Sequence, residues 1–175
     1  ALLSKLQDDK DAGVNDLIDS IDVLILVAVP EIGTASAMPA MLHGYNQRIG
    51  LGWLMDEVRA RELGRNMPGA FGLLPSREYI NRVNISPATF VDTAIPSGVT
   101  TKFVQDFGTD LDSYTEYKSF LFGEEGKIDP VSSQTKLPIV LSPSLFSQAE
   151  SLHDSIDPWT PPLGMRVIEV AGWGL

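Results

Sequence analysis

Hydrophobic positions divide the chain into two sheet-like ends and a long irregular middle. The uninterrupted aliphatic run 22–29 predicts a parallel strand buried on both faces, because strands covered on both sides read as continuous apolar segments. Residues 1–10, with leucines at helical spacing, predict a helix ahead of it, and 165–171 predicts a second strand. These elements are typical of an α/β protein with a parallel sheet.

The loop 30–34 follows the first predicted strand and leads into a helix of small residues that ends near His43. Thr34 or Ser36 is expected as its N-cap and Gly44 as its terminator. We assign this helix, with the strand and the helix before it, to a core segment 1–44.

Between Tyr45 and Pro138 the pattern changes to short helices separated by glycine- and proline-rich loops, which predicts an insertion over 45–138. One helix is expected over 53–65, with Asp56 and Glu57 in its first turn and an ion pair between Glu57 and Arg61. The sequence 113–116 has the form of a capping box that opens another helix, ending at Gly123.

The last segment, 139–175, is expected to return to the sheet. A helix begins at Ser142 and Pro143, and its apolar residues fall on one stripe before the chain enters the second strand. That stripe consists of Leu145, Ala149, Leu152 and Ile156. Since both predicted strands need neighbours, we expect further polypeptide on both sides of the chain.

Composition narrows the classes of function. The chain has 175 residues, of which 43% are hydrophobic, enough for a folded core. Its formal net charge of -10 at pH 7 repels polyanions, so we expect no nucleic acid as a partner. The absence of cysteine excludes disulfides, thiolate metal sites and cysteine nucleophiles.

Catalytic motifs are absent from the sequence. It contains no G-x-S-x-G elbow for a nucleophilic serine and no H-E-x-x-H zinc motif, so we assign no catalytic residue, no metal and no cofactor. His43 and His153 could each act as a base. A structural role is favoured for both, because His43 closes a helix and His153 lies beside an apolar stripe.

Two groups of residues suggest a binding site. Pro30, Gly33 and Thr34 follow the first strand, and ligands of open α/β sheets gather at the carboxyl ends of strands. Large apolar side chains also accumulate in the glycine-rich middle, where they form either a small core or a groove for an apolar substrate. They are Trp53, Leu54, Met55, Met67, Phe71, Leu73, Leu74 and Tyr79.

Several stretches together resemble the bacterial relatives of lecithin:cholesterol acyltransferase, a lipase-like branch of the α/β-hydrolases. Residues 27–34 and 42–45 look like the strand and loop that follow the nucleophile helix of that group. Residues 65–76 resemble its cap motif, which is the most specific match, and 153–175 look like its return into the sheet. Residues 90–138 contribute little to the resemblance.

The resemblance implies an incomplete α/β-hydrolase fold whose parallel strands bracket a mostly helical cap. It also implies ester chemistry by a serine, a histidine and an acid, none of which can be carried onto a position of this chain. The expected substrate is a lipid or another acyl ester, and the expected partner is the remainder of the parent hydrolase. Pro30, Gly33 and Thr34 would then lie near the floor of the acyl pocket, and the cap would contribute Trp53, Met67, Phe71 and Leu74.

Two alternatives remain open at this point. The chain could be a non-catalytic binding module that kept the shell of a hydrolase, or a self-sufficient domain with a hidden site. The second of these predicts measurable ester hydrolysis by the 175 residues alone, for which we expect only background rates.

Overall fold

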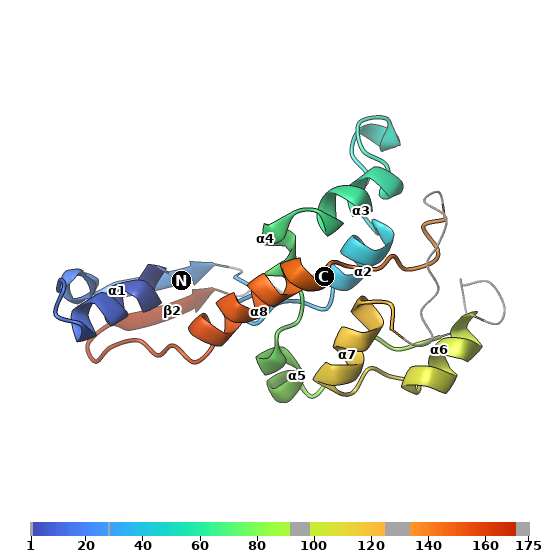
Figure 1. Cartoon of the computed structure of the whole chain (residues 1–175). Helices are drawn as coiled ribbons and strands as arrows, with labels where there is room; N and C mark the ends of the chain where they lie inside the picture. The colour runs from blue at the N-terminus through green and yellow to red at the C-terminus, as the bar shows by residue number, and fades with distance from the viewer. Residues whose placement is uncertain (1, 28, 92–98, 125–133, 171–175) are drawn as a thin grey trace. The chain divides into compact units, whose positions relative to one another are not determined.

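The computed structural model describes residues 2–27, 29–91, 99–124 and 134–170 (Figure 1). The chain forms two compact units. Unit 1 combines the two ends of the chain, Ala1–Glu31 and Ser151–Leu175, and unit 2 is Ile32–Glu150. Helices with one short parallel sheet confirm the α/β class predicted from the sequence.

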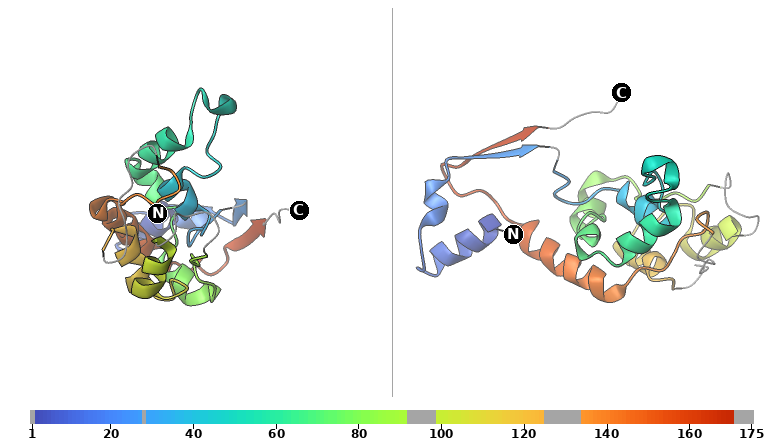
Figure 2. Two further views of the ribbon diagram at one scale, coloured as in Figure 1. Left: turned by 90° about the vertical axis from the view of Figure 1, so that its right-hand side faces the viewer. Right: turned by 90° about the horizontal axis from the view of Figure 1, so that it is seen from above.

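Unit 1 contains the sheet. Helix α1 (Leu2–Asp11) and the 3-10 turn η1 (Leu17–Ser20) precede strand β1 (Val23–Val27), which pairs with β2 (Arg166–Val170). The two strands run parallel (Figure 2). In their register, Ile25 lies opposite Ile168. The two predicted strands and the parallel sheet are therefore confirmed, while residues 1, 28 and 171 of the predicted elements lie outside the described residues.

The prediction that the first strand is buried on both faces is wrong for the described residues. Ile25 is 59% exposed and Val27 is 63% exposed, and every residue of β2 is exposed. The described sheet has two strands, and a continuous apolar run becomes buried only when further strands and covering layers flank it.

Unit 2 is helical. Its elements are α2 (Ala37–His43), η2 (Gly50–Gly52), α3 (Glu57–Arg65), α4 (Pro68–Phe71), α5 (Arg77–Val83), α6 (Val99–Phe107) and α7 (Tyr114–Leu121). Helix α8 (Pro143–Ile156) begins in unit 2 and ends in unit 1.

Helix α2 belongs to unit 2, although the sequence analysis placed it with the first core segment. It packs on α3, and the two helices meet closely at the turn that ends α2. Gly44 adopts φ 69° there, and a Cβ at this position would lie 2.0 Å from the carbonyl oxygen of Glu57. Only glycine fits such a left-handed position against another backbone, so the predicted terminator is confirmed.

The capping signals of unit 2 are local and are mostly confirmed. Ser113 and Glu116 form both hydrogen bonds of a capping box at the start of α7. Helix α3 begins at Glu57 rather than at Trp53, because the side chain of Asp56 accepts the hydrogen bond from the backbone N–H of Arg59 at 2.8 Å and so acts as N-cap. Ser36 occupies the N-cap of α2 without a capping hydrogen bond from its side chain.

The core of unit 2 is formed by side chains from most of its helices and from the segment 137–141. Its aromatic members pack edge to face, as such rings prefer. The buried residues are Ala37, Met38, Met41, Leu42, Phe71, Leu74, Phe103, Phe107, Leu111, Tyr117, Phe120, Leu121, Leu137, Ile139, Leu141, Phe146 and Ala149.

Helix α8 buries only part of the stripe predicted for it. Ala149 is buried and Leu145 packs against the core, whereas Leu152 is 42% exposed, and Phe146 and His153 are buried in its place. The buried positions are spaced by three and four residues, as on one face of a helix, but this face is rotated from the leucine stripe because Phe146 packs among the rings of Tyr114, Tyr117 and Phe122.

Candidate functional site

A cleft of about 520 Å³ opens in unit 2, within the range of small-molecule sites. Its walls come from α2, the start of α3, the segment 87–91, the helices α6 and α7, and the segment 135–138. The lining is mostly apolar: Met38, Pro39, Leu42, Pro87, Ala88, Phe90, Val91, Phe103, Phe120 and Pro138.

Aromatic rings form one wall of the cleft. Phe103 and Phe120 are buried in the core of the unit, and the half-buried Phe90 packs against both, with ring centroids 5.3 Å from each. Phe103 and Phe120 meet edge to face at 5.5 Å. The cleft therefore opens directly onto the packed aromatic core, so an apolar ligand would meet a preformed surface.

Polar side chains gather where α2 ends and α3 begins. His43, Tyr45, Glu57, Thr135 and Lys136 line this part of the cleft. The Nδ1 atom of His43 lies 2.7 Å from the carbonyl oxygen of Thr135, and since a carbonyl only accepts, Nδ1 carries the hydrogen. The Thr135 hydroxyl donates to Glu57 Oε2 at 3.4 Å. The cleft is thus apolar on one side and polar on the other.

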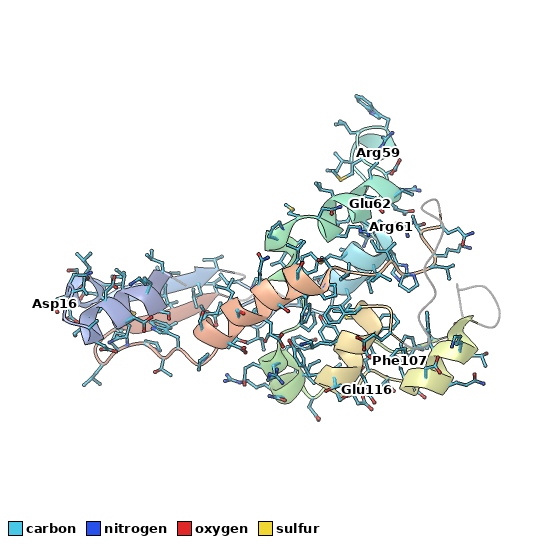
Figure 3. The ribbon with its side chains drawn as sticks, viewed as in Figure 1. Asp16, Arg59, Arg61, Glu62, Phe107 and Glu116 are labelled. Atoms are coloured by element: carbon cyan, nitrogen blue, oxygen red, sulfur yellow. The ribbon has the colours of Figure 1, made fainter. Side chains whose placement is uncertain are left out.

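Buried Arg61 fixes the segment that carries Thr135 and Lys136. Its side chain is fully buried, and its Nη1 donates to the carbonyl oxygens of Gln134 at 3.1 Å and Leu137 at 3.3 Å. Burial lowers the pKa of Arg61 below its ordinary value, partly offset by the carboxylate of Glu62. Figure 3 shows Arg61, Arg59 and Glu62 on α3.

The predicted ion pair between Glu57 and Arg61 is replaced by other contacts. Glu57 pairs with Arg48 at 3.4 Å, and Arg61 turns to the backbone carbonyls of 134 and 137. Helical spacing predicts only which residues are neighbours on the surface of one helix. Arg61 instead contacts a segment that lies more than seventy residues further along the chain.

Four of the residues predicted for the acyl pocket lie together in unit 2. The Thr34 N–H donates to the carbonyl of Leu73 at 2.9 Å, and Gly33 packs on Leu74. Phe71 and Leu74 are each 1% exposed and belong to the core. This group joins the loop after β1 to the turn after α4 and does not line the cleft.

The remaining predicted residues are exposed. Trp53 is 77% exposed, Met67 is 47% exposed, and Pro30 lies on the surface of unit 1. None of the three lines the cleft. Their assignment to a substrate pocket stays a prediction.

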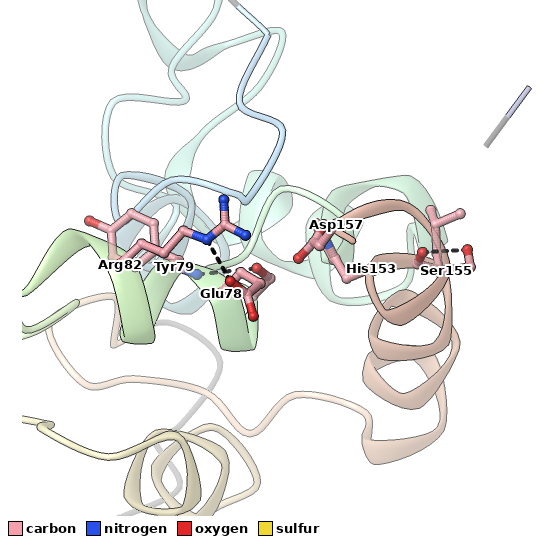
Figure 4. A network of polar contacts seen from close by, with 8 residues as sticks. Glu78, Tyr79, Arg82, His153, Ser155 and Asp157 are labelled. Atoms are coloured by element: carbon pink, nitrogen blue, oxygen red, sulfur yellow. Dashed lines mark hydrogen bonds and ion pairs between the residues drawn. The ribbon is translucent and has the colours of Figure 1, made fainter. Parts of the chain in front are cut away.

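His153 forms a buried pair with Asp157 at the end of α8. His153 Nδ1 lies 2.9 Å from Asp157 Oδ1, and the two side chains are 10% and 5% exposed (Figure 4). The Asp157 N–H also donates to the carbonyl of His153 at 2.8 Å, so the pair ties the chain leaving the helix to its last turn. A base with an orienting acid resembles part of a catalytic triad, but acyl transfer also needs a nucleophile, and the sequence has no nucleophile elbow.

The described residues contain no group of three or more His, Cys, Asp or Glu residues placed to hold a metal ion. No helix among them combines the length and the apolar character needed to cross a bilayer.

Comparison with known proteins found no matching family model, no matching curated protein and no matching solved structure. The site is therefore interpreted from its own geometry.

Of the residues that line the cleft, only His43 was considered as a functional candidate from the sequence. The lining comes from six segments far apart in the chain, and no motif links them. The available signal was the clustering of phenylalanines at 90, 103, 107 and 120 in a region otherwise rich in polar loops. Aromatic residues at these positions indicate a core, and only the fold reveals that the core has an open side.

Proposed function

We propose that this chain is part of a serine-dependent ester or lipid hydrolase or acyltransferase, in which unit 2 is the cap and its cleft holds the acyl chain. The cleft carries the proposal, because an apolar lining with an aromatic wall and one polar end matches an ester with a hydrocarbon tail. The chain itself would contribute binding and not the nucleophile, since the sequence has no G-x-S-x-G elbow.

The exposed strands of unit 1 support the same proposal. Ile25, Val27 and Ile168 expose apolar surface on a sheet of two described strands. Such surface is normally covered by further strands and helices. In the proposed hydrolase, the remainder of the parent protein would supply these layers together with the reacting serine, acid and histidine.

A binding experiment tests the proposed cleft. We expect ethyl decanoate to bind the 175-residue chain with a Kd on the order of 100 µM by isothermal titration calorimetry, a modest value for a ligand of this size. Ala88→Phe places a ring in the cleft and should raise this Kd about tenfold or more, since it removes space for the acyl chain.

The matched control is Ala70→Phe. Ala70, like Ala88, is partly buried and packs against the core, but it does not line the cleft. Both variants carry the same cost of overpacking, on the order of 1–3 kcal/mol, so circular dichroism should show both folded to the same extent. Equal Kd values for the two variants, or no binding by the unmodified chain, would refute the assignment of the cleft.

A non-catalytic binding module is the second candidate, and the lack of a nucleophile elbow is the observation that favours it. The gene on either side of the coding segment separates the two. A G-x-S-x-G elbow encoded upstream, with an acid and a histidine downstream, supports the hydrolase, while substituted positions support the binding module.

A further inference from the structure

We propose that Lys136 lets the cleft also recognise an apolar chain with a carboxylate head group, that is, the long-chain acid that hydrolysis of the ester releases. This inference rests on the proposed function, because it deepens the chemistry of the same cleft. It follows from the charge at the polar end of the cleft.

Lys136 differs from the other lysines of the described residues. Each of the others has a carboxylate within ion-pair distance: Lys5 pairs with Asp9, Lys10 with Asp19, Lys102 with Asp106 and Lys118 with Glu150. Lys136 lines the cleft and makes no ion pair with any described residue, in a chain whose formal net charge is -10. A lysine that lines a mostly apolar cleft and has no ion-pair partner among the described residues is a ready partner for an anion in an acidic protein.

Glu57 is the acidic residue of the lining, and it is already engaged. Its Oε1 pairs with the Arg48 Nε at 3.4 Å, and its Oε2 accepts from the Thr135 hydroxyl at 3.4 Å. These contacts balance the charge of Glu57 without using Lys136. Among the described residues that line the polar end of the cleft, the charge left without an opposite partner is therefore positive.

Contacts of its neighbours in the chain hold the backbone of Lys136 at the cleft. Its neighbours 134 and 137 are fixed by the buried guanidinium of Arg61, and Thr135 by its contact with His43. The backbone that carries Lys136 is thus anchored on both sides, so less conformational entropy is lost when a ligand engages this residue. A chain lying on Phe90 and Leu42 can present its carboxylate to this end.

The test compares two ligands of equal chain length, decanoate and decanol, at pH 7.5, where the carboxyl group is ionised. Lys136→Met keeps an apolar stem and removes the charge. It should raise the Kd of decanoate about tenfold and leave the Kd of decanol unchanged, because only decanoate gains a charge-assisted hydrogen bond.

The matched control is Lys102→Met. Lys102 is a lysine of α6 that pairs with Asp106 and does not line the cleft, so its loss should change neither Kd. If Lys136→Met raises both Kd values equally or changes neither, recognition of the carboxylate is refuted while the cleft remains the acyl site. If neither decanoate nor decanol binds the unmodified chain, the proposed function fails together with this inference.

Discussion

Gly33 lies so close to Leu74 that a Cβ atom on Gly33 would be 2.1 Å from the Leu74 carbonyl oxygen. Two hydrogen bonds flank this contact, from the Thr34 N–H to the Leu73 carbonyl and from the Ser76 N–H to the Ile32 carbonyl. The loop after β1 and the turn after α4 therefore form one tightly packed junction in unit 2. Residues of this loop and this turn were predicted from the sequence to line an acyl pocket. In the structure, the contact between them holds the fold of unit 2 together.

The first prediction concerns this junction. Gly33 has φ +86°, and Gly52 has φ +90° with no atom within 4 Å of a built Cβ. Gly52→Ala should lower the free energy of unfolding by about 1–2 kcal/mol, the strain of a left-handed alanine. Gly33→Ala should cost at least about 2 kcal/mol more, because its methyl group also collides with backbone. Urea denaturation followed by circular dichroism measures the difference, and equal costs would contradict the packed junction.

A second prediction concerns the support of the cleft wall. Arg61→Met leaves the carbonyls of Gln134 and Leu137 without their donor, so it should lower the free energy of unfolding by about 2–4 kcal/mol. Arg59→Met, on the same helix, removes a side chain that is 65% exposed and should cost less than about 0.5 kcal/mol. Similar costs for the two variants would show that Arg61 does not anchor the segment.

The third prediction concerns the buried hydroxyl of Tyr117. The Tyr117 side chain is fully buried, and its hydroxyl has no hydrogen-bond partner among the described residues. Tyr117→Phe removes an unsatisfied polar group while keeping the ring, so it should raise the free energy of unfolding by about 1 kcal/mol at pH 7. Tyr45→Phe, at a position that is 60% exposed, should leave it unchanged. A loss of stability in Tyr117→Phe would indicate a partner for the hydroxyl.

The same residue predicts a dependence of stability on pH. Burial raises the pKa of Tyr117 well above its ordinary value, with a further contribution from Tyr114. Above about pH 10 the unfolded state loses this proton while the folded state keeps it, so the contribution to stability is full below that pH and falls as the pH rises. Denaturation between pH 9 and pH 11 should show a steeper decline for the unmodified chain than for Tyr117→Phe. Parallel declines would mean that Tyr117 ionises freely in the folded state.

Local features of the fold could be predicted from the sequence because a few neighbouring residues decide them. The capping box of Ser113 and Glu116 and the left-handed Gly44 are examples, since each depends on hydrogen bonds within one or two turns. The apolar composition of the first strand also predicted a parallel sheet, although not that the two strands would pair directly.

Burial and the cleft could not be predicted, because they depend on contacts between distant segments. The aliphatic run of β1 indicated a central strand. A strand is buried only when other strands and helices cover it, and its own sequence does not show whether they do. The helical spacing predicted an ion pair between Arg61 and Glu57, yet Arg61 donates to the backbone carbonyls of residues 134 and 137. Phe90 was not selected as a site residue from the sequence. Only the packing of the segment 87–91 against α6 and α7 shows that its ring lines an open cleft.

The most direct test of the proposed acyl cleft is a titration followed by NMR of methionine methyl groups. The chain has five methionines. Met38 lines the cleft, whereas Met67, selected from the sequence for the acyl pocket, is exposed elsewhere in the unit. On addition of ethyl decanoate, we predict that the methyl resonance of Met38 shifts progressively to saturation and that the resonance of Met67 stays in place. A shift of Met67 with an unchanged Met38 would contradict the account.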